Sequence, residues 1–193
     1  MAQPLAERLR PTSFDGYVGQ KHLVGEGAVL RRMIESGRLL SFIMWGPPGT
    51  GKTTIARIIA HRLNRPFYTL NAVSSGVKEV REVIEKAKSS PLFSRGGAIL
   101  FIDEIHRFNK SQQDSLLSAV ETGIVTLIGA TTENPSFEVI RPLLSRCQLY
   151  VLKSLEDFLL LELLLKLLVI KLLIKNKWML QIITVKVQNY HLS

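Results

Sequence analysis

The chain has 193 residues, a length that holds one domain, or one domain and a fragment of another. Its single cysteine, Cys147, excludes an internal disulfide framework and fits a reducing cytosol, and its four histidines lack metal-ligand spacing. The formal net charge of +9 favours a polyanionic partner such as nucleic acid, with a solvated basic surface as the alternative. The first residues lack the charged and apolar regions of a secretory signal, so we expect a cytoplasmic protein.

Strand and helix patterns alternate along most of the chain. Pro11 and Gly16 predict an extended or turning segment over residues 5–19. In chain order we then expect a helix over 23–36, a strand over 39–45, a helix over 54–63, a strand over 67–70, a helix over 77–87, a strand over 97–102, a helix over 111–120, a strand over 124–130, a helix over 139–144 and a strand over 148–152. This alternation indicates an α/β fold, a five-stranded parallel sheet with helices on both faces.

The stretch between the first strand and its helix fits the phosphate-binding pattern G-x-x-x-x-G-K-[ST]. Glycine backbones adopt angles closed to other residues, so their N–H groups can surround an anion, and the following helix adds its positive N-terminal end. Lys52 is expected to reach the β- and γ-phosphates of a nucleotide, and the Thr53 hydroxyl to bind Mg²⁺. A chance glycine-rich turn is the alternative, which the flanking strand and helix argue against. The predicted nucleotide-binding residues are Gly46, Pro47, Pro48, Gly49, Thr50, Gly51, Lys52, Thr53 and Thr54.

Two carboxylates follow the buried strand over 97–102. Asp103 comes at the end of the strand and is expected to hold Mg²⁺, while Glu104 is expected to activate the water that attacks the γ-phosphate. An ordinary acidic strand end is the alternative, and the phosphate loop earlier in the chain favours the catalytic interpretation. A GTPase is excluded because the guanine-reading pattern N-K-x-D, begun by Asn109 and Lys110, has Gln112 where aspartate is required. ATP is therefore the expected nucleotide.

The chain resembles the AAA+ ATPases, and within them the replication-associated recombination protein A family with its eukaryotic Werner-helicase-interacting relatives. The resemblance runs from about residue 4 to about residue 155, and its narrowest phrases are DEIHRFNKSQQD over 103–114 and GATTENPSFE over 129–138. It implies an ATP hydrolase with ATP and Mg²⁺ as ligands. It also implies single-stranded, forked or gapped DNA as a partner, an assembly of several copies, and single-strand-binding and replication proteins as further partners, close to the nucleoid in a bacterium.

The resemblance also implies roles for residues outside the two motifs. Thr131 matches the sensor-1 position, which detects the γ-phosphate, although Thr132 or Asn134 can hold that position if the register shifts. Arg146 matches an arginine finger that is offered to the nucleotide of a neighbouring subunit, with a surface arginine as the alternative. Val18 and Gly19 match the segment that packs on adenine. By analogy with clamp loaders, Lys78 and Arg81 face a DNA channel, although a solvated helix face is the commoner explanation for such charges.

The resemblance ends near residue 155, so the expected organisation is a linker segment over 1–19, an ATPase core over 20–155 and an aberrant tail over 156–193. Charges at Glu162, Lys166, Lys171 and Lys175 interrupt the apolar tail, so a membrane span is not expected. A truncated or frameshifted product is the favoured interpretation of the tail, a diverged lid helix is the alternative, and an interfacial membrane helix ranks lower. We therefore expect a DNA-linked ATPase with impaired turnover; the alternatives are a nucleotide-binding fragment without catalysis, a clamp-loader subunit, or a Holliday-junction branch-migration motor.

Overall fold

The computed structural model describes residues 7, 10–89 and 97–155, together with tail residues 161, 164–165, 168–169 and 171–172. The chain divides into two compact units, and the unit that holds the phosphate loop is Arg10–Ser154. This unit begins ahead of the expected boundary at residue 20. Residues 10–19 belong to it because they pack on its core, where Phe14 is 7% exposed.

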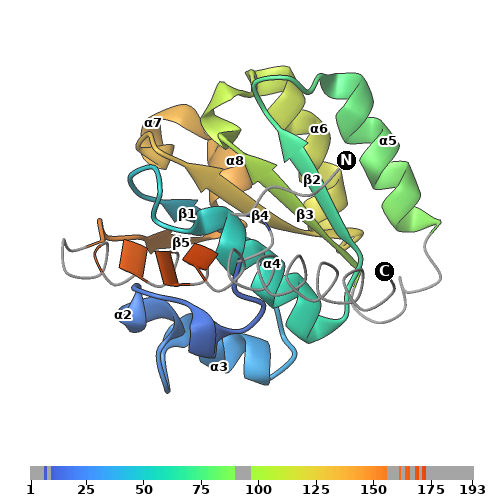
Figure 1. Ribbon diagram of the computed structural model, residues 1–193. Helices are drawn as coiled ribbons and strands as arrows, with labels where there is room; N and C mark the ends of the chain where they lie inside the picture. Colours follow the sequence, from blue (N-terminus) through green and yellow to red (C-terminus); the bar gives the residue numbers. More distant parts are fainter. Residues whose placement is uncertain are drawn as a thin grey trace, which may run out of the picture. The chain divides into compact units, whose positions relative to one another are not determined.

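The first unit is built on five parallel strands, as the sequence predicts. The strands are β1 (Phe42–Trp45), β2 (Phe67–Asn71), β3 (Ala98–Asp103), β4 (Val125–Thr131) and β5 (Gln148–Val151). They lie in the order β2-β3-β4-β1-β5, and every neighbouring pair is parallel (Figure 1). Parallel strands place their carboxyl ends at one edge of a sheet, so the segments that follow β1, β3 and β4 meet there.

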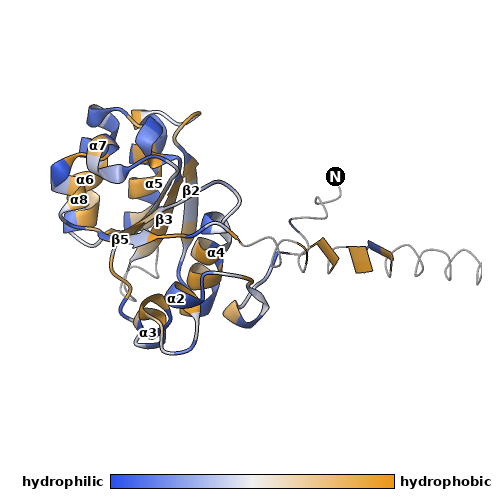
Figure 2. Cartoon of the chain, turned by 90° about the vertical axis from the view of Figure 1, so that its left-hand side faces the viewer, coloured by the Kyte–Doolittle hydropathy of each residue, from blue (hydrophilic) through white to orange (hydrophobic). Residues whose placement is uncertain are grey.

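Helices cover both faces of the sheet. They are α2 (Lys21–Val24), α3 (Val29–Glu35), α4 (Lys52–Leu63), α5 (Val77–Lys88), α6 (Lys110–Glu121), α7 (Pro135–Glu138) and α8 (Arg141–Leu144), with short 3-10 turns at Phe14–Gly16 and Ile105–Arg107. Figure 1 shows α2, α3 and α4 on one side of the sheet and α5 and α6 on the other. Figure 2 shows hydrophobic and hydrophilic residues side by side along α5 and α6, as helices half-buried against a sheet require.

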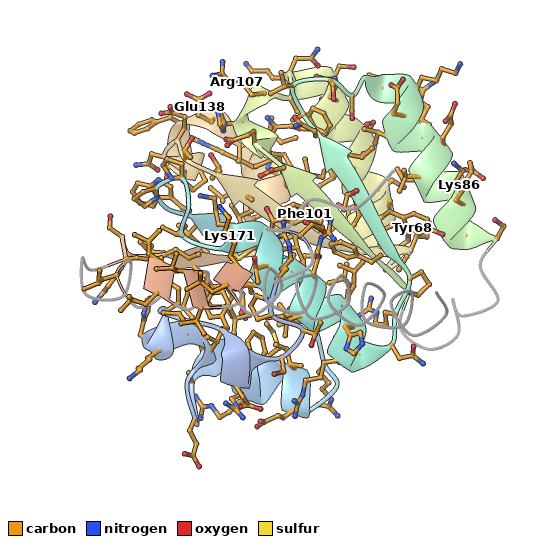
Figure 3. All side chains as sticks on the ribbon, viewed as in Figure 1. Tyr68, Lys86, Phe101, Arg107, Glu138 and Lys171 are labelled. Atoms are coloured by element: carbon orange, nitrogen blue, oxygen red, sulfur yellow. The ribbon has the colours of Figure 1, made fainter. Side chains whose placement is uncertain are left out.

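Side chains alternate between the two faces of each strand, so the sheet separates two hydrophobic cores. Phe42 and Phe101 belong to the core beneath α2, α3 and α4, and Phe101 is labelled in Figure 3. The ring of Phe101 stacks on that of Phe67, with ring centroids 6.2 Å apart. Ile43 and Leu100, one residue out of phase, belong to the core beneath α5, α6 and α8. Burial on both faces explains why these strands are continuous apolar runs in the sequence.

One local prediction was wrong. The single helix expected over 23–36 is two helices, α2 and α3, because the chain breaks between them. A Cβ at Gly25 would lie 2.4 Å from the Lys21 carbonyl oxygen, and Gly27 has φ +68°. The segment after β4, for which no element was expected, contains the short helix α7, whose start is capped by Asn134 Oδ1, 3.0 Å from the Ser136 amide. Pro135 fits there because the first helical residue needs no amide donor.

The described tail residues are helical, and their hydrophobic side chains are exposed. Leu161, Leu164, Leu165, Leu168, Val169 and Leu172 all have exposed fractions between 51% and 61%. None of the helices formed by described residues is both long enough and apolar enough to cross a membrane. The expectations for residues 156–160, 162–163, 166–167, 170 and 173–193 lie outside the described part of the chain.

Candidate functional site

The carboxyl edge of the sheet carries a pocket of about 330 Å³ beside the phosphate loop. The loop leaves β1, the next strand in the sheet is β4, and β3 lies beyond it. The structure therefore brings the loop and the carboxylates at the end of β3 to one pocket, although they are far apart in sequence. Its lining residues are Arg10, Pro48, Gly49, Thr50, Gly51, Lys52, Thr53, Thr54, Asp103 and Glu104.

Glycines shape the loop where side chains would not fit. Gly49 and Gly51 have φ angles of +76° and +88°, a region that L side chains rarely adopt. A Cβ at Gly46 would lie 2.5 Å from the Leu152 carbonyl oxygen. The loop leads directly into α4, a helix of 12 residues whose first amide groups have no partner within the helix. Backbone amides and the helix dipole thus make this edge attractive to phosphate.

Lys52 is held at the loop by two carbonyl oxygens. Its ammonium donates to Gly46 O at 2.7 Å and to Pro47 O at 2.8 Å. Burial lowers the pKa of Lys52, and the negative charges of Glu104 and Asp103 oppose that shift. A cation so placed faces the same pocket as the two carboxylates, which suits a ligand that carries both phosphates and a metal ion.

Asp103 ends β3 at this pocket, opposite Asn71 of β2. Burial raises the pKa of Asp103, and the adjacent Glu104 carboxylate raises it further, while a backbone hydrogen bond and Lys52 act in the other direction. The surroundings thus destabilise the ionised form of Asp103, and a cation bound beside it would stabilise that form.

Glu104 lies in a left-handed backbone conformation, with φ 54°. Non-glycine residues adopt this region rarely, and strained conformations of this kind cluster at functional sites. Its Oε2 lies 3.4 Å from the Thr132 hydroxyl and 3.3 Å from His106 Nδ1. The Thr131 hydroxyl is fully buried and contacts His106 Nδ1 at 3.0 Å. Of the three candidates for the sensor, the structure places Thr132 beside Glu104, Thr131 behind it, and Asn134 as the cap of α7.

Comparison with known proteins identifies the family. Residues 42–155, from β1 to just beyond β5, match the family described as "ATPase family associated with various cellular activities (AAA)". The chain belongs to the AAA family of ATPases. ATP binding and hydrolysis are thus properties of its family.

Several AAA proteins are similar to this chain. Replication-associated recombination protein A of Haemophilus influenzae is 59% identical over 152 residues, which are 79% of this chain and 34% of that protein. The Escherichia coli protein of the same name is 56% identical over 154 residues, or 80% of this chain and 34% of that one. ATPase WRNIP1 of Dictyostelium discoideum is 51% identical over 152 residues, 79% of this chain and 17% of that protein. The chain spans about a third of the length of these bacterial relatives.

The solved structure of a Holliday junction branch migration motor, RuvB of Thermotoga maritima, has a similar fold. It superposes with a TM-score of 0.60 and is 32% identical, covering 76% of this chain and 48% of that one. The similarity confirms the nucleotide-binding fold, including the parallel sheet with helices on both faces.

The segment before α2 supplies contacts to the AAA phosphate loop that the sequence did not point to. Tyr17 Oη donates to Thr50 O at 2.8 Å and lies where a Cβ on Gly51 would be. Arg10 lines the pocket, and its Nη1 donates to the Thr54 hydroxyl at 3.3 Å. Val18 and Gly19, predicted to pack on adenine, are half-buried and are not among the described residues that line the phosphate pocket.

Arg146 lies at the opposite edge of the sheet, just before β5. Its guanidinium pairs with Glu121 at 2.6 Å and donates to Pro142 O at 2.7 Å. It faces a second cavity, of about 650 Å³, which the amino ends of β4 and β5 help to line. The structure therefore does not bring Arg146 to the phosphate pocket of its own chain, and its predicted role requires a neighbouring subunit.

The pocket suits Mg²⁺ held together with nucleotide phosphates. Among the described residues, no three histidine, cysteine, aspartate or glutamate side chains form a metal-binding group. Thr53 and Asp103 nevertheless line one pocket. Mg²⁺ is commonly bound by one or two protein oxygens and the substrate phosphates rather than by a cage of protein ligands. The donor set of this pocket fits that pattern.

Proposed function

We propose that the chain is the ATP-hydrolysing part of a protein that acts on DNA in replication-associated recombination and repair. The single observation that carries the proposal is the convergence of Lys52 and Thr53 with Asp103 and Glu104 on one pocket at the carboxyl edge of the sheet. The similarity to Replication-associated recombination protein A supports the DNA-linked process. Because the chain spans about a third of those relatives, the substrates and partners of the whole protein are part of the proposal.

In the proposed reaction, the loop amides and Lys52 bind the β- and γ-phosphates of ATP. Thr53 and Asp103 would hold Mg²⁺, which would supply positive charge that neutralises the phosphates. Glu104 takes a proton from the attacking water, whose oxygen bonds to the γ-phosphorus as the bond to the β-phosphate oxygen breaks. The products are ADP and inorganic phosphate. Thr132, the hydroxyl nearest Glu104, is the better placed of the three sensor candidates.

Arg146 is proposed to act on the nucleotide of a neighbouring copy. An arginine supplied to a transferring phosphoryl group accelerates hydrolysis by about 10³–10⁵ where such arginines occur. This requires an assembly of several copies and release of Arg146 from Glu121. DNA with single-stranded, forked or gapped regions is the proposed activator, and a cytoplasmic, nucleoid-associated site follows from that partner. The similarity to RuvB keeps a branch-migration motor as the second candidate.

Lys52→Ala and Glu104→Gln separate binding from chemistry. We expect Lys52→Ala to weaken ATP binding at least about a hundredfold, because it removes a charge-assisted contact to the phosphates. Glu104→Gln is expected to keep the parental affinity and lose turnover. Titration of a fluorescent ATP analogue and phosphate release, with and without forked DNA, measure the two properties. Parental affinity in Lys52→Ala would overturn the assignment of the pocket.

The same assay distinguishes an ATPase from a nucleotide-binding module without turnover. Forked DNA, a four-way junction and duplex DNA are compared as activators of the parent chain. Stimulation by forked DNA above that by the junction supports the recombination-type ATPase, and the reverse order supports the branch-migration motor. Binding without any turnover supports the non-catalytic module.

A further inference from the structure

His106 lies behind the carboxylate that is proposed to activate water. It belongs to the 3-10 turn Ile105–Arg107, two residues after Glu104, and its side chain is 6% exposed. It is not among the described residues that line the phosphate pocket. Its Nδ1 contacts two oxygens, Thr131 Oγ1 at 3.0 Å and Glu104 Oε2 at 3.3 Å. A buried imidazole thus bridges the end of β4 and the proposed base.

The hydrogen-bond partners of Thr131 indicate whether Nδ1 of His106 carries a hydrogen. The Glu133 amide donates to Thr131 Oγ1 at 3.0 Å, and the Glu133 carbonyl lies 3.1 Å away on the accepting side. A hydroxyl donates once and accepts twice, so a Thr131 proton directed at this carbonyl leaves one lone pair to be filled. His106 Nδ1 fills it only if it carries a hydrogen. An ionised Glu104 oxygen 3.3 Å from Nδ1 repels a bare nitrogen lone pair and attracts an N–H dipole, so this electrostatic contact favours the same hydrogen.

We propose that His106 is a positioning residue that holds the Glu104 carboxylate for catalysis through an Nδ1–H donor anchored on Thr131. The inference rests on the proposed role of Glu104 as the base. The Thr132 hydroxyl donates to Oε2 of Glu104 at 3.4 Å, and His106 Nδ1 lies 3.3 Å from the same oxygen. Both groups act on Oε2, which leaves Oε1 as the oxygen that accepts the proton of the attacking water. These contacts also hold Glu104 in its left-handed conformation at φ 54°, which its backbone alone disfavours.

A purely packing role is the competing explanation, because His106 is buried beside the core residue Ile105. The two explanations differ in what they require of the imidazole. Packing requires only its volume, whereas positioning requires a donor at the Nδ1 atom. Asparagine places an amide nitrogen on the same carbon that bears Nδ1, whereas glutamine places its amide nearer to the Nε2 position. His106→Asn and His106→Gln therefore form a matched pair of variants.

The first experiment needs no ATP turnover. Two-bond ¹H–¹⁵N spectra of the ¹⁵N-labelled 193-residue chain at pH 8 identify which ring nitrogen of each histidine carries hydrogen. We expect His106 in the Nδ1–H form, and we expect Glu104→Gln to shift its ring resonances while those of the exposed His61 stay unchanged. An Nε2–H form of His106 would overturn the proposal, since a bare Nδ1 cannot donate to a carboxylate. Unchanged His106 resonances in Glu104→Gln would overturn it as well.

The second experiment measures turnover and nucleotide affinity in His106→Ala, His106→Asn and His106→Gln. We expect His106→Ala to bind ATP within about twofold of the parent and to lose turnover by about 10–100-fold, as loss of a supporting hydrogen bond does at other catalytic centres. His106→Asn should recover most of the loss, and His106→Gln should not. Parental turnover in His106→Ala, or equal losses in the Asn and Gln variants accompanied by equal losses of thermal stability, would overturn the proposal.

Failure of the proposed function gives a different result. If Glu104→Gln hydrolyses ATP as fast as the parent, or if the parent does not hydrolyse ATP, Glu104 is not shown to act as the base. The spectra then still decide whether His106 donates to Glu104. The two failures are therefore distinguishable.

Discussion

Arg10 brings a second positive charge to a pocket whose other cation is Lys52. The Arg10 guanidinium donates a hydrogen bond to the hydroxyl of Thr54. Because Thr54 directly follows Thr53, the proposed magnesium ligand, this guanidinium lies within the phosphate-binding region. The Lys52 ammonium already donates to two loop carbonyl oxygens. A nucleoside triphosphate also carries more negative charge than one ammonium group neutralises. We therefore assign Arg10 a part in ATP affinity, separate from catalysis.

Arg10→Ala tests this assignment. We expect its dissociation constant for ATP to rise about tenfold, the loss of one charge-assisted hydrogen bond in a partly exposed pocket. Arg62→Ala removes an equal charge from an exposed position at the far end of α4 and is the matched control. Titration of the fluorescent ATP analogue compares the two variants. Equal affinities would show that the charge of Arg10 does not reach the phosphates.

Cys147 provides a test of the packing at the amino edge of the sheet. Burial raises the pKa of its thiol from 9.0 to about 12. The folded chain therefore holds this proton more tightly than the unfolded chain, and the resulting stability is present below pH 9 and is lost as the pH rises toward 12. At pH 8 the thiolate fraction should be about a thousandfold lower in the folded chain.

The rate of alkylation by iodoacetamide measures this difference in thiolate fraction, because Cys147 is the only cysteine of the chain. We expect the rate at pH 8 to be lower in buffer than in concentrated urea by about the same thousandfold. The mass of the intact chain gives both rates directly. Rates that agree within about tenfold would mean that the half-buried thiol is less shielded from water than its raised pKa requires.

At the scale of elements, Gln113 joins α6 to the segment between α7 and α8. Its side chain is 1% exposed, and its amide nitrogen donates to Phe108 O at 2.9 Å and to Glu138 O at 3.0 Å. Its amide oxygen accepts from Ile140 N at 2.9 Å. A single buried amide thus satisfies three backbone groups of irregular segments near the catalytic edge.

Gln113→Ala should therefore destabilise the fold without touching the pocket. We expect the free energy of unfolding to fall by about 2–4 kcal/mol, because buried backbone groups lose their partners. The exposed neighbour Asp114, changed to alanine, is the control and should change that free energy by about 0.5 kcal/mol or less. Urea unfolding measures both. If the two variants unfold at the same urea concentration, the hydrogen bonds of Gln113 do not stabilise the fold.

Long apolar runs made the strands predictable, since strands buried on both faces exclude polar residues. The break between α2 and α3 was missed because the apolar spacing of 23–36 continues across Gly25 and Gly27, and that spacing was given more weight than the two glycines. The choice between Thr131 and Thr132 depends on the residue at which β4 ends, since successive side chains face opposite sides of a strand. Sequence periodicity does not fix that residue.

Contacts between distant segments were the least predictable part of the site. Lys52 and Glu104 were found from motifs because their neighbours in sequence carry the signal. Arg10 lies in a segment far ahead of the loop, and nothing local marks it as a pocket residue. His106 was noted only as one of four scattered histidines, because its partner Thr131 belongs to another strand. The phrase DEIH placed it near Glu104, but the direction of its ring comes from the fold.

At the scale of the whole molecule, the unit Arg10–Ser154 holds both hydrophobic cores and all described residues that line the phosphate pocket. The described tail residues instead expose leucines and a valine over more than half of each side chain. Contiguous exposed apolar surface favours association between molecules. We therefore expect nucleotide binding to depend on the unit Arg10–Ser154 and association between molecules to depend on the tail.

Deletion of residues 157–193 tests this division. We expect the shortened chain to bind the fluorescent ATP analogue within about twofold of the 193-residue chain, since the pocket and its supporting cores are retained. Light scattering of concentrated samples should fall, because the exposed leucines are removed. A full-length variant with Leu161, Leu164, Leu168 and Leu172 changed to glutamine is the matched control, and it should also scatter less while binding ATP normally. The opposite result is a loss of affinity of about tenfold or more on deletion, while the leucine-to-glutamine control binds ATP like the parent. It would instead assign the tail to closure of the nucleotide site. The tail would then be a working lid, and turnover by the 193-residue chain would depend on it.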